Sequence, residues 1–216
     1  MFPNSTYAES VDFTFWFIVG ISFALLILIS FLMVFFVIKY NRKKKVKAVN
    51  IHGNLPLEIL WTVIPVLLTL AMFYYGWMGY KDLSNPPADS MVVKSTGQMW
   101  KWTYEYDNGL KTDTLFVPVN KPVRIDLISA DVNHSFYIPA LRIKRDVIPN
   151  RKNFLWFQAE NTGSFDIACA EYCGLQHSYM YSKVVIMPED KFNEWFATAT
   201  DSMNSASVVI DTATTK

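Results

Sequence analysis

The sequence predicts two transmembrane helices followed by an all-β domain. Residues 13–38 and 59–80 carry no charged side chain over 26 and 22 residues, and each stretch exceeds the ~20 residues that cross a bilayer as a helix. After residue 91, short segments rich in Val, Ile, Phe, Tyr and Trp alternate with turn signals, a pattern typical of a sandwich or barrel. Because a buried core helix rarely runs this long without a polar face, we interpret both stretches as membrane spans.

A basic segment joins the two apolar stretches. Six cations fall within nine positions that contain no acid: Lys39, Arg42, Lys43, Lys44, Lys45 and Lys47. The positive-inside rule makes this segment cytoplasmic, which places the N-terminus and the C-terminal domain on the outer side of the membrane. No Lys or Arg precedes Lys39, so the basic start of a secretory signal peptide is missing. A formal net charge of +1 gives no indication of a nucleic-acid partner.

Turn and capping residues indicate the domain limits. Asn54, Pro56 and Glu58 are typical of a helix start and open the second span. Paired prolines and small polar residues mark LSNPPADS as a linker. We predict a transmembrane helical hairpin over 1–82, a linker over 83–90, an all-β domain over 91–200 and a mobile tail over 201–216. Within the third segment we expect seven to nine antiparallel strands and then a short amphipathic helix.

The twelve residues 169–180, CAEYCGLQHSYM, predict a metal site. They hold both cysteines of the chain and one of its three histidines. Cys169, Cys173 and His177 recur every four residues, Met180 follows three later, and Gly174 supplies backbone freedom between them. Two thiolates, an imidazole and a thioether are soft ligands, which select copper, zinc or iron over calcium or magnesium.

A first-row metal held by this loop still lacks a ligand. His134 lies between strand-like segments in DVNHSFYIP, whereas His52 lies in the basic loop, so we prefer His134. A disulfide between the cysteines would close a very small loop and would leave the neighbouring ligands unexplained. A mononuclear copper site leaves one cysteine unused, and a Cys2His2 zinc site leaves the methionine unused. These three alternatives remain open on the residues alone.

The chain closely resembles cytochrome c oxidase subunit II, the dinuclear copper A subunit of the haem-copper oxidases. The segments CAEYCGLQHSYM, DVNHSFYIPALRIKRD, WKWTYEY and LEILWTVIP carry the resemblance, which extends over most of the chain. It implies a cupredoxin-like Greek-key barrel behind the two helices. In such a barrel the two sulfurs bridge two copper ions, each imidazole completes one end, the thioether is a weak axial ligand, and a backbone carbonyl serves the second copper. The implied ligands are His134, Cys169, Glu171 through its carbonyl, Cys173, His177 and Met180.

The resemblance also implies roles for four further groups. The side chain of Glu171 would help to bind a magnesium ion shared with subunit I, although a loop carboxylate can simply be solvated. Trp100 would receive electrons from cytochrome c, although it could equally be a barrel core residue. Glu58 would feed a proton pathway in the neighbouring subunit, or serve only the helix dipole. Asp146 matches an acid beneath the copper site, and Asn150 replaces a glycine of the family.

These expectations define a function. The resemblance implies a subunit that accepts electrons at copper A and passes them to haem in subunit I, supporting oxygen reduction and proton pumping, with subunit III as a further partner. The expected location is a bacterial plasma membrane or, alternatively, a mitochondrial inner membrane. Because no CxxCH haem-attachment motif is present, the donor is expected to be a separate cytochrome c or a complex that contains one. The alternatives are a copper A subunit of a nitric oxide reductase and a structural quinol-oxidase subunit, which lacks the copper ligands.

Overall fold

The computed structural model describes residues 5, 7–44, 50 and 52–214, and side chains as far as residue 205. Lys45 and Lys47 of the basic segment and the last two residues of the expected tail lie outside the described residues. The chain divides into two compact units. A helical unit covers Ser10–Tyr80, and a β unit combines Lys81–Lys216 with the N-terminal Met1–Glu9.

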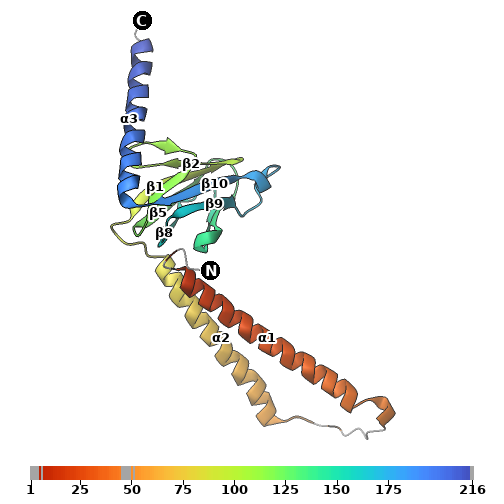
Figure 1. Cartoon of the computed structure of the whole chain (residues 1–216). Helices are drawn as coiled ribbons and strands as arrows, with labels where there is room; N and C mark the ends of the chain where they lie inside the picture. Colours follow the sequence, from red (N-terminus) through yellow and green to blue (C-terminus); the bar gives the residue numbers. More distant parts are fainter. Residues whose placement is uncertain (1–4, 6, 45–49, 51, 215–216) are drawn as a thin grey trace. The chain divides into compact units, whose positions relative to one another are not determined.

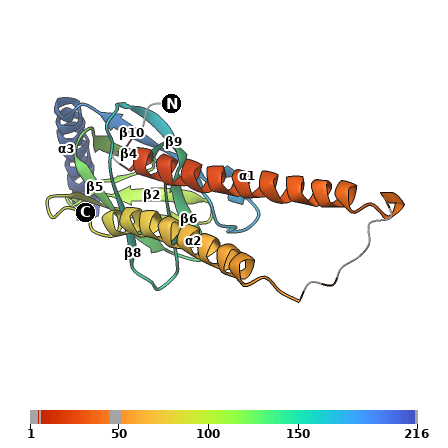
Figure 2. The same ribbon diagram turned by 90° about the horizontal axis from the view of Figure 1, so that it is seen from below.

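Two long helices make up most of the helical unit. They are α1 (Ala8–Lys39) and α2 (Leu55–Leu83), with the short 3-10 helix η1 (Arg42–Lys44) after the first. The two helices run side by side (Figure 2). The ring of Tyr75 in α2 packs edge-on against Phe13 and Phe17 in α1, with centroids 5.6 and 5.3 Å apart. Most of the large apolar side chains of α1 and α2 are exposed. Both helices are long and apolar enough to cross a membrane. Each helix contains one predicted span and extends it at both ends.

The start of α2 is capped by side chains. The Asn54 Oδ1 accepts a hydrogen bond from the Leu57 N–H at 3.2 Å, and the Glu58 Oε1 accepts one from the Asn54 N–H at 3.3 Å. This reciprocal arrangement satisfies two donors that a helix start would otherwise leave unpaired. The predicted helix start is therefore confirmed, and the Glu58 carboxylate belongs to the cap.

The β unit contains two five-stranded sheets, which Figure 1 shows as two layers. The first has the order β3-β2-β1-β5-β8, with β1 (Met91–Gln98), β2 (Lys101–Glu105), β3 (Lys111–Thr112), β5 (Pro122–Ser129) and β8 (Asn153–Gln158). The second has the order β4-β10-β9-β6-β7, with β4 (Leu115–Pro118), β6 (His134–Ile138), β7 (Ile143–Val147), β9 (Gly163–Cys169) and β10 (Tyr181–Met187). Two 3-10 helices, η2 (Pro139–Leu141) and η3 (His177–Tyr179), lie in the connections.

The sheets are mixed, not wholly antiparallel as the sequence predicted. β1 pairs in parallel with β5, and β4 pairs in parallel with β10, while the remaining strand pairs are antiparallel. The reason is the route of the chain: it leaves the first sheet after β3, adds β4 to the second sheet, and returns to place β5 beside β1. Such crossing between layers is compatible with parallel neighbours, which a direct hairpin cannot produce.

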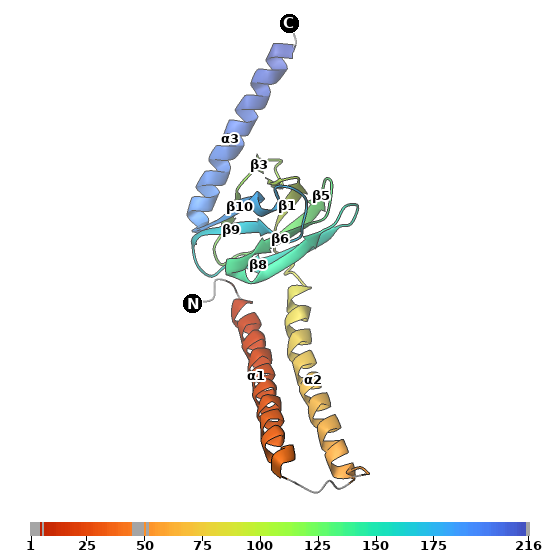
Figure 3. The same cartoon turned by 90° about the vertical axis from the view of Figure 1, so that its right-hand side faces the viewer.

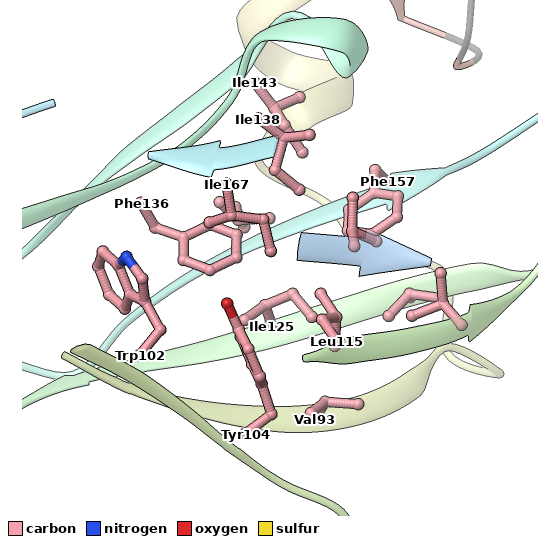
Figure 4. Packing of buried hydrophobic residues seen from close by; sticks show 14 of the residues in the cluster. Val93, Trp102, Tyr104, Leu115, Ile125, Phe136, Ile138, Ile143, Phe157 and Ile167 are labelled. Carbon is pink, nitrogen blue, oxygen red and sulfur yellow. The ribbon is translucent and has the colours of Figure 1, made fainter. Parts of the chain in front are cut away.

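The core lies between the two sheets and is strongly aromatic. Trp102 and Tyr104 point inward from β2, and the ring of Phe136 from β6 meets both edge-on, at centroid distances of 5.2 and 6.4 Å (Figure 4). All three side chains are almost completely buried. Inward residues alternate with outward ones along β5, as expected for a strand with one buried face. The core therefore supports β6, the strand that begins at His134.

The C-terminal helix α3 (Glu189–Thr214) is longer than the short helix predicted before a tail at 201–216. Its first turns pack on the barrel, where the ring centroids of Trp195 and Phe116 are 4.3 Å apart. Figure 3 shows the helix continuing beyond the sheets. In the Ser/Thr-rich part, the Ser202 and Ser205 hydroxyls bond to carbonyls four residues earlier, an arrangement that is compatible with a continuous helix. The composition of residues 201–216 alone predicts a mobile tail, which is not what the structure shows up to Thr214.

Candidate metal centre

The cysteine loop connects β9 to β10 and is closed by backbone hydrogen bonds. Cys169 is the last residue of β9, and its N–H bonds to the Met180 carbonyl at 3.1 Å. Within the loop, the His177 N–H bonds to the Gly174 carbonyl at 3.1 Å, and Gly174 has a φ of +120°. A residue with a Cβ adopts this conformation only with strain. The positive φ of Gly174, which the sequence predicted to be a flexible position, allows the loop to reverse its direction here.

The loop and β6 bring five soft donor atoms together. The sulfurs of Cys169 and Cys173 are 3.8 Å apart, and both thiols are free. The His134 Nδ1 lies 3.8 Å from the Cys169 sulfur, whereas the His177 Nδ1 lies 3.7 Å from the Cys173 sulfur. The Met180 sulfur is 3.7 Å from that of Cys173. Each imidazole therefore stands beside a different sulfur.

The chemistry of these donors fits a soft first-row metal. His134, Cys169 and Cys173 form a buried metal-ligand group whose donor atoms lie within 4.8 Å of one another. With metal–sulfur bonds of about 2.3 Å, sulfurs 3.8 Å apart subtend an angle close to tetrahedral. Cys169 and Cys173 are too far apart for a disulfide, which needs about 2.05 Å between the sulfurs. His134 joins the group, and His52 is an exposed residue of the helical unit.

Comparison with known proteins identifies the family. The family model for the transmembrane domain of cytochrome c oxidase subunit II matches residues 3–76, and the model for its periplasmic domain matches residues 108–189. The chain belongs to the cytochrome c oxidase subunit II family. Cytochrome c oxidase subunit 2 of Cereibacter sphaeroides is 30% identical, over 85% of this chain and 74% of the relative. That of Alkalihalophilus pseudofirmus is 34% identical, over 75% of this chain and 51% of the relative.

A solved structure agrees with this assignment for the β unit. The periplasmic domain of subunit II of cytochrome oxidase from Bradyrhizobium japonicum is 36% identical, covers 54% of this chain and 97% of its own, and superposes with a TM-score of 0.51. The predicted fold, two membrane helices followed by a cupredoxin-like barrel, is therefore confirmed. As a subunit II chain, it is a membrane protein and part of an oxidoreductase complex.

In this subunit II chain, Asp131 orients the His134 ring, a role that the motif did not reveal. The Asp131 Oδ1 lies 2.7 Å from the His134 Nε2, and the Oδ2 accepts the Met99 N–H at 2.7 Å. The Val132 N–H also donates to this carboxylate, at 2.7 Å. Because the hydrogen bond occupies Nε2, Nδ1 is the nitrogen left for a metal. The only sequence signal was an acid three residues before the histidine.

The pKa values of two ionisable groups at the site are shifted in opposite directions. Although desolvation raises the pKa of Asp131, the hydrogen bonds from Met99, His134 and Val132 outweigh it, so the net pKa is lowered. Burial, and then the hydrogen bond and charge of Cys169, raise the pKa of the Cys173 thiol to about 11. A thiolate in this position is unfavourable unless a nearby cation compensates, so metal uptake here must release a proton.

Trp100 lies against the cysteine loop. A Cβ placed on Gly174 would lie 3.4 Å from the Trp100 Nε1 and 3.7 Å from the Met99 sulfur, so the indole is in contact with the loop backbone. The indole N–H is buried and has no hydrogen-bond partner within the described residues, and Trp100 as a whole is half-buried. The structure thus places this aromatic at the edge of the site, between surface and loop.

The other four predicted residues occupy different surroundings. Glu171 is exposed, and its carbonyl oxygen lies 3.2 Å from the Cys169 sulfur. Asp146 on β7 accepts hydrogen bonds from Ser135 at 2.9 Å and Lys144 at 3.0 Å, which lower its pKa. Asn150 has a φ of 60°, so it adopts the left-handed conformation expected of a glycine replacement. Glu58 belongs to the helical unit and does not join the site.

Replacing Asp131 with Asn is expected to weaken copper binding about 10–100-fold, the usual effect of losing a carboxylate that orients a ligand histidine. An amide offers one acceptor oxygen, which cannot serve both the His134 ring and the Met99 N–H. Competition with a copper chelator on the detergent-solubilised full chain measures the affinity. Asp166→Asn, which removes an exposed carboxylate paired with Lys183, is the control and should bind as wild type. Equal affinities for both variants would contradict the orienting role.

Proposed function

We propose that this chain accepts electrons from cytochrome c at a dinuclear copper centre and passes them to haem in subunit I. The observation that carries the proposal is the pairing of each imidazole with a different sulfur: His134 beside Cys169 and His177 beside Cys173. One metal would leave part of this set unused, whereas two metals would be held by all of it, with both thiolates available to each. When bound, such a copper pair shares one electron between its two metals, so each transfer needs little rearrangement.

The surrounding residues have distinct parts in this function. The Met180 sulfur and the Glu171 carbonyl lie beside different cysteines, which suits a weak ligand for each end of the pair. The buried surroundings exclude water and keep the soft ligands desolvated. Trp100, half-buried against the loop, offers a wide aromatic surface through which a docked donor can couple to the site. The exposed Glu171 side chain is free to contribute to a magnesium ion shared with subunit I.

The proposal extends to the membrane arrangement and partners. The basic segment that begins at Lys39 supports a cytoplasmic connection between α1 and α2, with the copper domain on the periplasmic face of a bacterial plasma membrane. Glu58 would then stand at the cytoplasmic start of α2, where it could supply a proton pathway of subunit I. Subunit III is a further expected partner. The nitric oxide reductase alternative is not favoured, because the curated relatives described above are cytochrome c oxidase subunits.

Copper reconstitution of the full chain tests the centre. We expect two copper ions per chain, a purple colour and the multi-line EPR spectrum of a mixed-valence pair. A single copper per chain, or a colourless protein, would refute the dinuclear assignment. For the assembled complex, we expect oxygen consumption with reduced cytochrome c. A complex that retains both copper ions but consumes no oxygen would refute the oxidase role and leave the copper assignment intact.

A further inference from the structure

A basic pocket lies on the outer face of the first sheet, and none of the metal-site donors lines it. Lys94 from β1, Arg124 and Asp126 from β5, and Lys152 just before β8 provide three cations and one carboxylate. The aromatic ring of Phe154 also lines it, and its volume is about 290 Å³. Lys94 is paired with Glu105 at 3.1 Å and Arg124 with Asp126 at 2.8 Å, so the net positive charge of the pocket comes from Lys152. This charge and the size both suit a small anionic group with an apolar part.

The pocket holds Arg124 in a fixed orientation. Its Nε donates to the Asp126 Oδ1 at 2.8 Å, and its guanidinium lies 4.6 Å from the centre of the Phe154 ring. These contacts use Nε and one face of the group, and within the part of the chain that the structure describes they leave the terminal nitrogens for another acceptor. A pre-oriented guanidinium with free terminal nitrogens is well suited to bind phosphate through two hydrogen bonds. Lys152 is exposed and forms no ion pair within the described residues, so its charge is uncompensated.

The same face of the sheet is tied to the ends of both membrane helices. Arg124 stands opposite Trp156 in the β5–β8 ladder. The Trp156 Nε1 donates to the carbonyl of Asp82, in the last turn of α2, at 3.2 Å. Tyr7, the residue before α1, packs edge-on against the Trp156 ring at 4.8 Å. Chain segments that enter or leave a span lie at the level of the lipid headgroups, where Tyr and Trp are enriched. Directly paired residues have Cβ atoms about 5 Å apart, so the Arg124 side of the pocket adjoins Trp156 and the chain segments that it contacts.

We propose that the pocket binds the phosphate of an anionic phospholipid headgroup. The charge selects the phosphate, while the Phe154 ring and the partly exposed Ile128 offer contact to the apolar part of the lipid. The position of Arg124 beside Trp156 favours a membrane lipid as the source of this phosphate, since Trp156 contacts the chain segments at the ends of both spans. The proposal depends on α1 and α2 being membrane spans, and it does not depend on copper.

Native mass spectrometry of the full chain in mild detergent tests the proposal, with phosphatidylglycerol and phosphatidylcholine as competing probes. We expect one tightly retained phosphatidylglycerol and at least tenfold weaker retention of phosphatidylcholine. The double variant Arg124→Gln/Lys152→Gln should retain phosphatidylglycerol about thirtyfold more weakly, the effect expected for removing two cations near a lipid phosphate. The matched control Lys121→Gln/Lys191→Gln removes two exposed lysines that are paired with Glu189 and Glu194, and it should behave as wild type.

Several outcomes would overturn this assignment. Equal retention of the two lipids, or equal loss in both double variants, would show that the pocket does not select the headgroup. Displacement of the lipid by low concentrations of inorganic phosphate would identify free phosphate as the ligand. Loss of subunit association in the Arg124→Gln/Lys152→Gln variant with unchanged lipid retention would identify an acidic protein partner. Unchanged copper content in that variant verifies its fold, and Lys152→Gln alone, an exposed substitution, provides a milder test.

Discussion

Replacing Cys173 with Ser is expected to reduce the copper content from two ions per chain to at most one, and to abolish the purple colour and the multi-line EPR spectrum. The Cys173 sulfur approaches three other donors: Cys169 at 3.8 Å, and His177 and Met180 at 3.7 Å each. A serine hydroxyl is nearly isosteric but is a hard ligand that bridges copper poorly. Copper analysis and EPR of the reconstituted full chain measure the effect.

The control for this experiment is His52→Asn. It removes the histidine that the metal site does not use, an exposed residue of the helical unit. The control should keep two copper ions and an unchanged spectrum. Loss of copper in the His52 variant, or a wild-type spectrum in Cys173→Ser, would contradict the ligand assignment. Circular dichroism of both variants shows whether the β unit has remained folded.

Replacing Gly97 with Ala is expected to destabilise the β unit by about 1–3 kcal/mol, the usual cost of over-packing a core, and to broaden the copper EPR spectrum. A Cβ at this position of β1 would lie 2.9 Å from the Trp102 Cζ3 and 3.2 Å from the His134 Cδ2. The methyl group cannot fit unless one of these rings moves. Since both rings are buried, the strain reaches His134, the proposed metal ligand. Urea unfolding and EPR measure the two effects.

A double-mutant cycle separates the two rings. Adding Trp102→Phe removes the Cζ3 atom and should recover part of the stability lost in Gly97→Ala, giving a coupling between neighbours of about 0.5–3 kcal/mol. Gly20→Ala adds the same methyl group in α1, where no atom lies within 4 Å of the new Cβ, so it should leave unfolding of the β unit and EPR unchanged. Additive free energies in the cycle would show that Trp102 is not the obstacle.

The local features of the fold were predictable from sequence, and the long-range ones were not. Charge-free length located both spans, and Asn54 marked the start of the second, because these signals act within a few residues. The parallel β1–β5 and β4–β10 pairs depend on which layer the chain visits next, which no local pattern encodes. The continuation of α3 to Thr214 was missed because hydroxyl side chains can bond within a helix or outside it.

The residues of the metal site were likewise predictable where the signal is local, and not where it depends on long-range contacts. The four-residue spacing of the loop predicted its soft donors, and the strand-like surroundings predicted that His134 would join them. Asp131 and Gly97 were not recognised, since their importance arises from contacts with the His134 ring that exist only after the strands have paired. The role of Glu58 and the magnesium ion involve neighbouring subunits, so they remain predictions for the assembled complex.

The N-terminal segment has a consequence for how the protein is made. Ser5 forms a β-bridge with Ala159, and its hydroxyl donates to the Leu141 carbonyl at 3.1 Å. Ser5 precedes both helices in the chain, so it reaches its final contacts only after β8 has been made and the two segments have met on the same side of the bilayer. Contacts between such distant parts of a chain form slowly. Completion of the β unit is thereby coupled to correct insertion of both helices, so a chain inserted with one span missing could not close this bridge.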